Sequence, residues 1–203
     1  MELDKLTEAV FRQLFIELEA SGRHVHVTRE QAMALFGHPL TPERPLSQPG
    51  QFLSRERVTV KGPKGEFQNV AVLGPERKAG QVEISLTDCR RLGLSAPVRL
   101  SGDTAGTPGA LLLGPRGTVQ LREGVIVAQR HVHLTPQAAD AFGVTNGEIV
   151  RLRTLTARPL IFEDVAVRVS PDFAPYAHLD FDEANACGFR KGDLGRIVPC
   201  AHC

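Results

Sequence analysis

The sequence is poor in large aromatic residues and in cysteine. Its 203 residues include no tryptophan, one tyrosine and four cysteines, and 24 basic residues against 23 acidic ones give a net charge of +1. Nucleic-acid-binding proteins normally carry a basic surface and often aromatic stacking platforms, so this composition argues against that class. Four scattered cysteines are too few for a disulfide scaffold. We expect Cys89 and Cys187 to pack as small apolar residues.

Long hydrophobic runs are also absent. No stretch of the sequence approaches the roughly 20 apolar residues of a membrane-spanning helix. The first eight residues carry three acidic side chains and one lysine, which is unlike the cationic start of a secretory signal. We therefore expect an intracellular, soluble protein. Leu3, Leu6, Val10 and Leu14 recur at helical spacing and predict an amphipathic helix that either packs on the neighbouring domain or docks a partner.

Glycine and proline, by contrast, are abundant. The 19 glycines and 14 prolines separate short apolar runs at intervals of about 8–12 residues, a pattern typical of small barrels and sandwiches. Thr28 with Gln31, and Thr135 before Pro136, are expected to cap short helices.

Two further short helices are expected downstream. Thr87 and Asp182 are their predicted N-caps, and Gly93 and Gly188 are the glycines at which they are predicted to end.

The chain repeats itself. Three blocks recur in the same order: SGRHVHVTREQAMALFG (Ser21–Gly37) with AQRHVHLTPQAADAFG (Ala128–Gly143), FQNVAV (Phe67–Val72) with FEDVAV (Phe162–Val167), and EISLTD (Glu83–Asp88) with HLDFDE (His178–Glu183). The second and third blocks start 16 residues apart in both copies. Such a pattern indicates a duplicated domain. We predict a mainly β protein with short helices: an N-terminal helix (1–17) and two similar small β-barrels (18–116 and 117–203), divided near Gly114–Gly124.

The histidines indicate metal binding. Residues i and i+2 of a strand point to the same face, so each His-x-His pair can close on one metal ion. Glu83 and His178 hold the same place in their copies. Each half thus offers three ligands: His24, His26 and Glu83 in one, His131, His133 and His178 in the other. Three protein ligands with an open position are typical of catalytic zinc, with Co, Ni or Fe as alternatives. If the two barrels face each other, the two ions lie close together.

Two other sets of residues attract attention. Arg77 precedes Glu83 by six residues and is expected near the first metal, where a guanidinium would bind a phosphate or carboxylate; a surface arginine is the alternative. The terminal CAHC (Cys200, His202 and Cys203) suggests either a further metal site or, more simply, an unstructured tail. The chemistry alone predicts a metal enzyme that acts on an anionic acyl or phosphoryl compound.

Several motifs together match a known family. SGRHVHVT, LSQPGQF, LGPERKAGQVEIS, SGDTAGTPG and HLDFDEANA resemble the PduL-type phosphate propanoyltransferases (phosphotransacylases) of bacterial microcompartments. The resemblance implies two β-barrel domains and a dinuclear zinc site. It also implies a reversible reaction in which a short-chain acyl-CoA, propanoyl-CoA or acetyl-CoA, and phosphate give acyl phosphate and coenzyme A.

The resemblance extends to individual residues. It implies that the two three-residue groups are the zinc ligands and that Arg77 is the catalytic, phosphate-binding residue. The positions that would contact coenzyme A are Ser21, Arg44, Leu73, His178 and Asn185. The N-terminal helix is similar to the peptides that pack such enzymes into microcompartments, so shell or core proteins are expected partners, and the location is either the microcompartment lumen or the cytoplasm. A homo-oligomer is a further option.

Two other functions fit the same residues. A dimetal hydrolase of thioesters or phosphoesters would use the same ligands, and a non-catalytic microcompartment component would need the ligands for folding but not Arg77.

Overall fold

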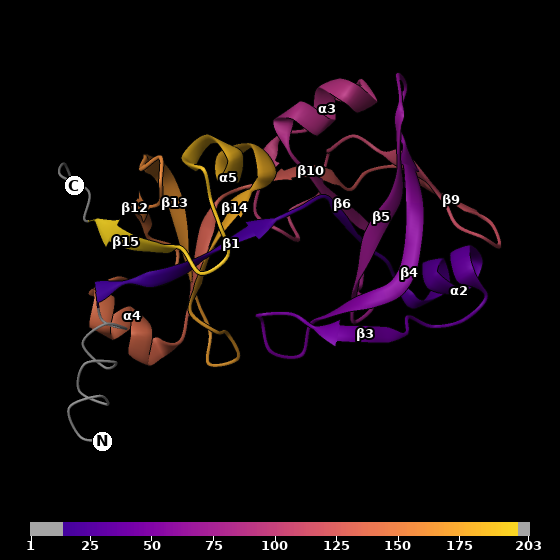
Figure 1. The fold of residues 1–203 in the computed structure, drawn as a ribbon. Coiled ribbons are helices and arrows are strands. Elements are labelled where there is room, and N and C mark those ends of the chain that lie inside the picture. Colours follow the sequence, from indigo (N-terminus) through magenta and orange to yellow (C-terminus); the bar gives the residue numbers. More distant parts are fainter. Residues whose placement is uncertain (1–13, 199–203) are drawn as a thin grey trace. The chain divides into compact units, whose positions relative to one another are not determined.

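The computed structural model describes residues 14–198, which form fifteen β-strands and four short α-helices. The described chain divides into two compact units (Figure 1). Residues 22–128 form one unit, called the sheet unit below; residues 14–21 and 129–198 form the other, called the barrel unit. Among the described residues, no helix is long and apolar enough to cross a membrane.

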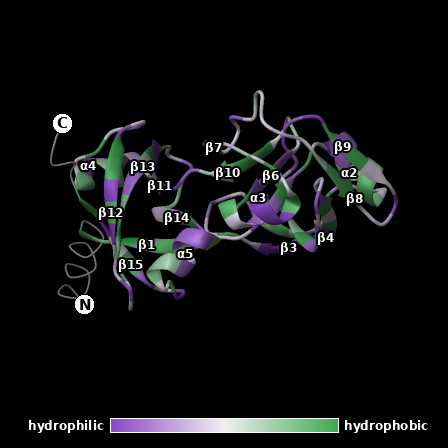
Figure 2. Ribbon diagram, turned by 90° about the horizontal axis from the view of Figure 1, so that it is seen from above, coloured by the Kyte–Doolittle hydropathy of each residue, from purple (hydrophilic) through white to green (hydrophobic). Residues whose placement is uncertain are grey.

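The barrel unit is a closed six-stranded barrel. The strands follow one another round the barrel in the order β1 (Ile16–Ser21), β14 (Tyr176–Asp180), β11 (His131–Leu134), β13 (Ile161–Val169), β12 (Ile149–Leu155) and β15 (Leu194–Val198). Helices α4 (Pro136–Phe142) and α5 (Phe181–Cys187) complete the unit. Buried and more exposed residues alternate along β12, a strand of mixed hydropathy (Figure 2), and Val150 and Leu152 are buried in the core. This alternation is the period-2 pattern that places one face of a strand in a barrel interior.

The sheet unit stays open. Its strands are paired in the order β7 (Val98–Arg99), β10 (Val125–Ala128), β6 (Gln81–Ile84), β2 (His24–His26), β5 (Glu66–Gly74), β4 (Phe52–Lys61), β8 (Ala110–Leu113) and β9 (Thr118–Leu121), with β3 (Pro42–Pro45) added to β4. Helices α2 (Arg29–Phe36) and α3 (Leu86–Leu92) belong to this unit. The prediction of two closed barrels is therefore correct for the second copy only, because β7 and β9 end the sheet without pairing with each other.

The two copies exchange one strand. Strand β1 precedes the first HVH sequence but pairs in parallel with β14 of the second copy, and β10 precedes the second HVH sequence but pairs in parallel with β6 of the first. The chain therefore passes from one compact unit to the other between Ser21 and Gly22, and back again between Ala128 and Gln129. The sequence-based domain boundaries, after residues 17 and 116, stay a prediction about the repeat copies and differ in position from these crossings. The glycines near residue 116 close the β8–β9 hairpin instead, with the Gly114 amide donating to the Gly117 carbonyl.

Two of the predicted helix starts are confirmed. The Thr28 side chain accepts a hydrogen bond from the Gln31 amide, and the Gln31 side chain accepts one from the Thr28 amide, which completes a capping box. The Thr135 hydroxyl caps α4 by accepting a hydrogen bond from the Ala138 amide, without a capping box, and Pro136 occupies the first turn.

The other two predicted N-caps, Thr87 and Asp182, are wrong by two residues. Ser85 caps α3 and Asp180 caps α5, each through a side-chain oxygen that accepts a backbone amide three residues on. Both helices follow their strands directly, so the residue at the strand end already serves as the cap. The predicted helix ends are confirmed, since Gly93 and Gly188 adopt left-handed conformations.

The ends of the chain test two further expectations only in part. Ile16 and Glu17 lie in β1, so the predicted helix over residues 1–17 does not extend that far. The rest of that segment and the terminal CAHC lie outside the described residues. Cys89 and Cys187 are buried in the two hydrophobic cores, as expected.

The strand exchange makes a prediction about fragments. A fragment of residues 22–128 keeps β10 and should unfold cooperatively on heating. A fragment of residues 18–116 loses Val125, Ile126 and Val127, all at most 2% exposed, and should be destabilised by about 5–9 kcal/mol at roughly 1.5–3 kcal/mol per buried aliphatic side chain. Thermal denaturation followed by circular dichroism compares the two fragments. Equal melting temperatures would contradict the exchanged arrangement.

Candidate metal centres

Each HVH sequence lies in an inner strand, between a parallel and an antiparallel neighbour. Strand β2 lies between β5 and β6, and β11 lies between β13 and β14. Val25 and Val132, the middle residues, belong to the hydrophobic cores. Because side chains alternate along a strand, the flanking histidines face away from the core of their own unit. The antiparallel neighbour supplies the third residue of each group: Glu83 opposite His24, and His178 opposite His131.

The first group brings His24, His26 and Glu83 together in the sheet unit. Their donor atoms all lie within 4.8 Å of one another. The Nε2 atoms of His24 and His26 lie 3.6 and 3.8 Å from the two carboxylate oxygens of Glu83. Ligands of tetrahedral zinc lie about 3.4 Å apart when each is about 2.1 Å from the ion, so a small contraction would complete the site.

Backbone carbonyls orient the two histidine rings of this group. The Nδ1 atom of His24 is 2.8 Å from the Gly22 carbonyl oxygen, and that of His26 is 3.2 Å from the Leu73 carbonyl oxygen. A proton on Nδ1 in each contact leaves Nε2 available as a ligand, which is the usual arrangement of a metal-binding histidine.

The second group brings His131, His133 and His178 together in the barrel unit, again with donor atoms within 4.8 Å of one another. The His131 and His178 rings stack at 5.0 Å, and His131 Nδ1 lies 2.8 Å from the Gln129 carbonyl oxygen, as His24 Nδ1 does from Gly22. His133 is 6% exposed, and among the described residues neither of its ring nitrogens has a hydrogen-bond partner. A buried imidazole with two such nitrogens fits a metal ligand.

The electrostatics of the groups favour a bound cation. Burial and the neighbouring positive charges lower the pKa of His26 well below its ordinary value, and burial with His131 and Arg168 lowers the pKa of His133 to about 3. Both rings are therefore neutral at pH 7, the form that binds a metal. Burial would lower the pKa of His24 and raise that of Glu83, but their mutual attraction outweighs it, so the His24 pKa is raised and the Glu83 pKa lowered.

An arginine holds the start of each HVH strand. Arg23 donates two hydrogen bonds to the Asp88 carboxylate, at 3.0 and 2.8 Å, and its guanidinium lies over the Phe67 ring at 4.2 Å. The second copy repeats the arrangement with Arg130, Glu183 and Phe162. The RHVH repeat is visible in the sequence, but no role was assigned to its arginine from the sequence. The recurrence of arginine, phenylalanine and acid at matching places was the signal that could have shown this contact.

A chain of hydrogen bonds joins Arg77 to the first group. Arg77 donates to Ser101 Oγ at 2.9 Å, and Gln81 Nε2 donates both to Ser101 Oγ at 3.0 Å and to Glu83 Oε1 at 2.6 Å. The Gly102 amide donates to Gln81 Oε1 at 2.8 Å. Sequence reasoning missed Gln81 and Ser101. Gln81 precedes Glu83 by two residues and so shares its face, but Ser101 is brought in by a loop that no local pattern predicts.

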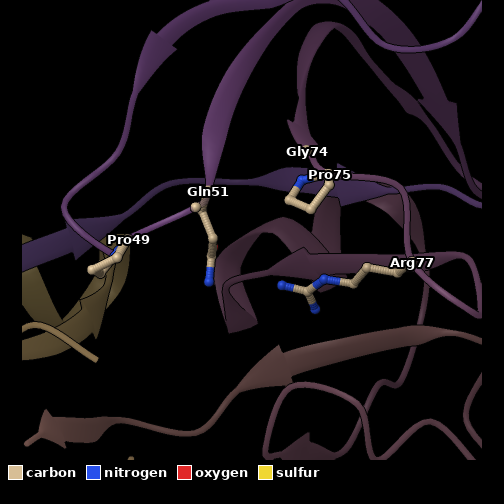
Figure 3. A pocket seen from close by; sticks show the side chains of 6 residues that line it. Pro49, Gln51, Gly74, Pro75 and Arg77 are labelled. Carbon is tan, nitrogen blue, oxygen red and sulfur yellow. The ribbon is translucent and has the colours of Figure 1, made fainter. Parts of the chain in front are cut away.

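Arg77 also lines a pocket within the sheet unit. The pocket has a volume of about 320 Å³ and is lined by Pro49, Gly50, Gln51, Gly74, Pro75 and Arg77. The polar ends of Gln51 and Arg77 extend into the same space (Figure 3). The pocket is large enough for a small anion and offers it a guanidinium and an amide.

The residues expected to contact coenzyme A fall in both units. Ser21 ends β1, His178 lies in β14 and Asn185 is exposed on α5, all in the barrel unit. Arg44 is exposed in β3 and Leu73 lies in β5, both in the sheet unit. Leu73 acts through its carbonyl oxygen on His26, a contact that the sequence did not suggest.

The fold and these groups define a duplicated β protein in which each copy carries three potential metal ligands. Residues 17–190 match the family of phosphate propanoyltransferases. Phosphate propanoyltransferases similar to this chain occur in Listeria monocytogenes (54% identical, covering 97% of this chain and 93% of the relative), Enterococcus faecalis (56%; 92% and 90%) and Thermotoga maritima (51%; 88% and 86%). The chain belongs to the phosphate propanoyltransferase family and is an acyltransferase.

The hydrogen-bond chain predicts an effect on metal affinity. Gln81→Leu keeps the side-chain volume but removes the donor to Glu83, so the zinc affinity of the first group should fall about 10- to 100-fold. Competition with a chromophoric chelator measures this. Gln68→Leu, a change at an exposed glutamine of β5, serves as the control and should leave the affinity unchanged. Equal zinc affinities for the two variants would show that the hydrogen bond from Gln81 to Glu83 does not support metal binding.

Proposed function

We propose that the chain transfers a short acyl group, propanoyl or acetyl, between coenzyme A and phosphate, with two metal ions at the histidine groups. The observation that carries the proposal is the chain Arg77–Ser101–Gln81–Glu83, because it joins an anion-binding guanidinium to a metal ligand. An enzyme that brings a phosphate to a metal-activated acyl group needs these two functions side by side.

The donor sets fit zinc. Five imidazoles and one carboxylate are ligands that zinc prefers, with Co, Ni or Fe as alternatives. A bound ion of this kind supplies Lewis-acid polarisation of a carbonyl group or stabilises a thiolate. In the chain itself, the backbone carbonyls of Gly22 and Leu73 orient the rings of the first group, and Gln81 orients the Glu83 carboxylate.

That the two ions share one site is proposed from the family resemblance. His24 follows the Ser21/Gly22 crossing between the units by two residues, and His131 follows the Ala128/Gln129 crossing in the same way. Each histidine doublet is thus tied by a few residues to a strand of the other unit. On this proposal the two groups act on one substrate, the thioester and the phosphate being held together.

Arg77 binds and orients phosphate in the proposed reaction. A phosphate oxygen attacks the thioester carbonyl carbon, the carbon–sulfur bond breaks, and coenzyme A leaves as its thiolate while acyl phosphate forms. Gln51, across the pocket from Arg77, hydrogen-bonds the same anion. Among the described residues both cysteines lie in hydrophobic cores, which favours direct transfer over an acyl-cysteine intermediate.

Coenzyme A is proposed to contact Ser21, His178 and Asn185 of the barrel unit and Arg44 and Leu73 of the sheet unit. The N-terminal segment is proposed to dock on shell or core proteins of a bacterial microcompartment, which would place the enzyme in its lumen rather than free in the cytoplasm. Both assignments rest on the family resemblance.

Removing the Arg77 guanidinium should weaken phosphate use. Arg77→Ala is expected to raise the phosphate KM at least tenfold and to lower kcat, because a charge-assisted phosphate contact is lost and Ser101 loses one of its two donors, the other being Gln81. The KM for propanoyl-CoA should change little. Lys78→Ala removes the same charge one residue on, at an exposed position, and is the matched control. Unchanged phosphate kinetics in Arg77→Ala would refute this role.

Metal removal and phosphate dependence test the reaction class. Dialysis against a chelator should abolish release of coenzyme A from propanoyl-CoA, and zinc should restore it. Release should need phosphate and should yield propanoyl phosphate in equal amount, measured by trapping with hydroxylamine. Release of free propanoate without phosphate would instead identify a dimetal hydrolase, and full activity without metal would exclude metal-dependent transfer.

A further inference from the structure

Glu19 lies beside the second histidine group. In the parallel pair of β1 and β14, Glu19 is the register partner of His178, and its Oε2 lies 3.6 Å from His178 Nε2. The same distance separates His24 Nε2 from Glu83 Oε2 in the first group. Neither the repeat comparison nor the family resemblance singles out Glu19.

The equivalent position in the other copy is apolar. In the parallel pair of β6 and β10, the register partner of Glu83 is Ile126, which is fully buried. Each unit therefore has one carboxylate in the pair formed by the third residue of the group and its parallel register partner. In the sheet unit it belongs to the ligand strand, as Glu83; in the barrel unit it belongs to the exchanged strand, as Glu19.

Charge gives this arrangement a physical reason. His24, His26 and Glu83 bring one negative charge to a divalent ion, whereas three neutral imidazoles bring none. A dication in a mostly buried site is costly unless anionic ligands offset its charge. His133 gives independent support for a bound ion in this group. It is buried, and within the described chain neither of its ring nitrogens has a hydrogen-bond partner.

We propose that Glu19 is the fourth ligand of the metal held by His131, His133 and His178. The proposal rests on the metal binding in the proposed function and extends it. The Glu19 side chain is 34% exposed, so its carboxylate can turn from the His178 side toward the ion. Both sites then carry one carboxylate. The second site then has four protein ligands and takes substrate by expanding to five-coordination, while the first has three and keeps an open position.

The strand also supplies a matched control. Glu17 lies on the same face of β1, two residues before Glu19, and is the register partner of Tyr176. Burial raises the pKa of the Tyr176 hydroxyl, with contributions from the Glu17 and Glu19 carboxylates. Glu17→Gln thus removes the same charge from the same strand face without removing the proposed ligand.

The experiment measures Co²⁺ binding in the full chain with the first group disabled by His24→Ala and His26→Ala, so that one ion per chain reports on the second group. Glu19→Gln is expected to lower the Co²⁺ affinity on the order of 100-fold and to change the visible absorption of bound Co²⁺, which depends on ligand number and type. Glu17→Gln should leave both unchanged, and Glu19→His, which offers another ligand, should restore part of the affinity. Circular dichroism of the metal-free variants checks that each is folded.

The outcomes separate this proposal from the one it rests on. If Glu19→Gln changes neither affinity nor spectrum, or lowers affinity without altering the spectrum, Glu19 is not a ligand and the proposal is overturned. If the chain with only the second group binds no Co²⁺ although it is folded, the metal-binding proposal for that group fails first.

Discussion

The register of two antiparallel strand pairs assembles both groups. His24 lies opposite Glu83, and His131 lies opposite His178. Because side chains alternate, the same register sends Val25 and Val132 into the two cores. A slip of one residue would take these valines out of the apolar cores and put histidines in their place, so the hydrophobic effect that closes each core also fixes the positions of the histidines. The metal groups are therefore a consequence of core packing rather than an addition to it.

The two copies share the local contacts that hold this register, and they differ in the residues next to the histidine groups. In both copies an arginine next to the HVH strand pairs with an acid in the first turn of the helix that follows the third ligand. Only the sheet unit adds Gln81, Ser101 and Arg77, which extend its group toward an anion pocket. Duplication thus provided two equivalent scaffolds, and substitution beside one of them provided the hydrogen-bond chain to Arg77, the residue proposed to bind phosphate.

The sequence correctly predicted which residues cluster in each group, because two periodic patterns coincide at these positions. The period of two in a strand pairs the histidines, and the internal repeat aligns Glu83 with His178. The helix caps that follow the two HVH sequences, Thr28 and Thr135, were also predicted correctly, since capping is local. The exchanged strands and the open sheet of the first copy were not predicted, because whether β10 pairs with β6 or with its own copy is decided by contacts far apart in the chain.

The strand exchange has a consequence for how the two groups depend on each other. Strand β1 of the first copy lies beside His178, and strand β10 of the second copy lies beside Glu83, so neither third ligand is flanked only by its own copy. A change in either exchanged strand therefore alters the group that belongs to the other repeat. Ile126 shields Glu83 with an apolar side chain, whereas Glu19 brings a carboxylate to His178. The exchanged strands are the places where the two metal groups can acquire different chemistry without any change to the HVH strands that build them.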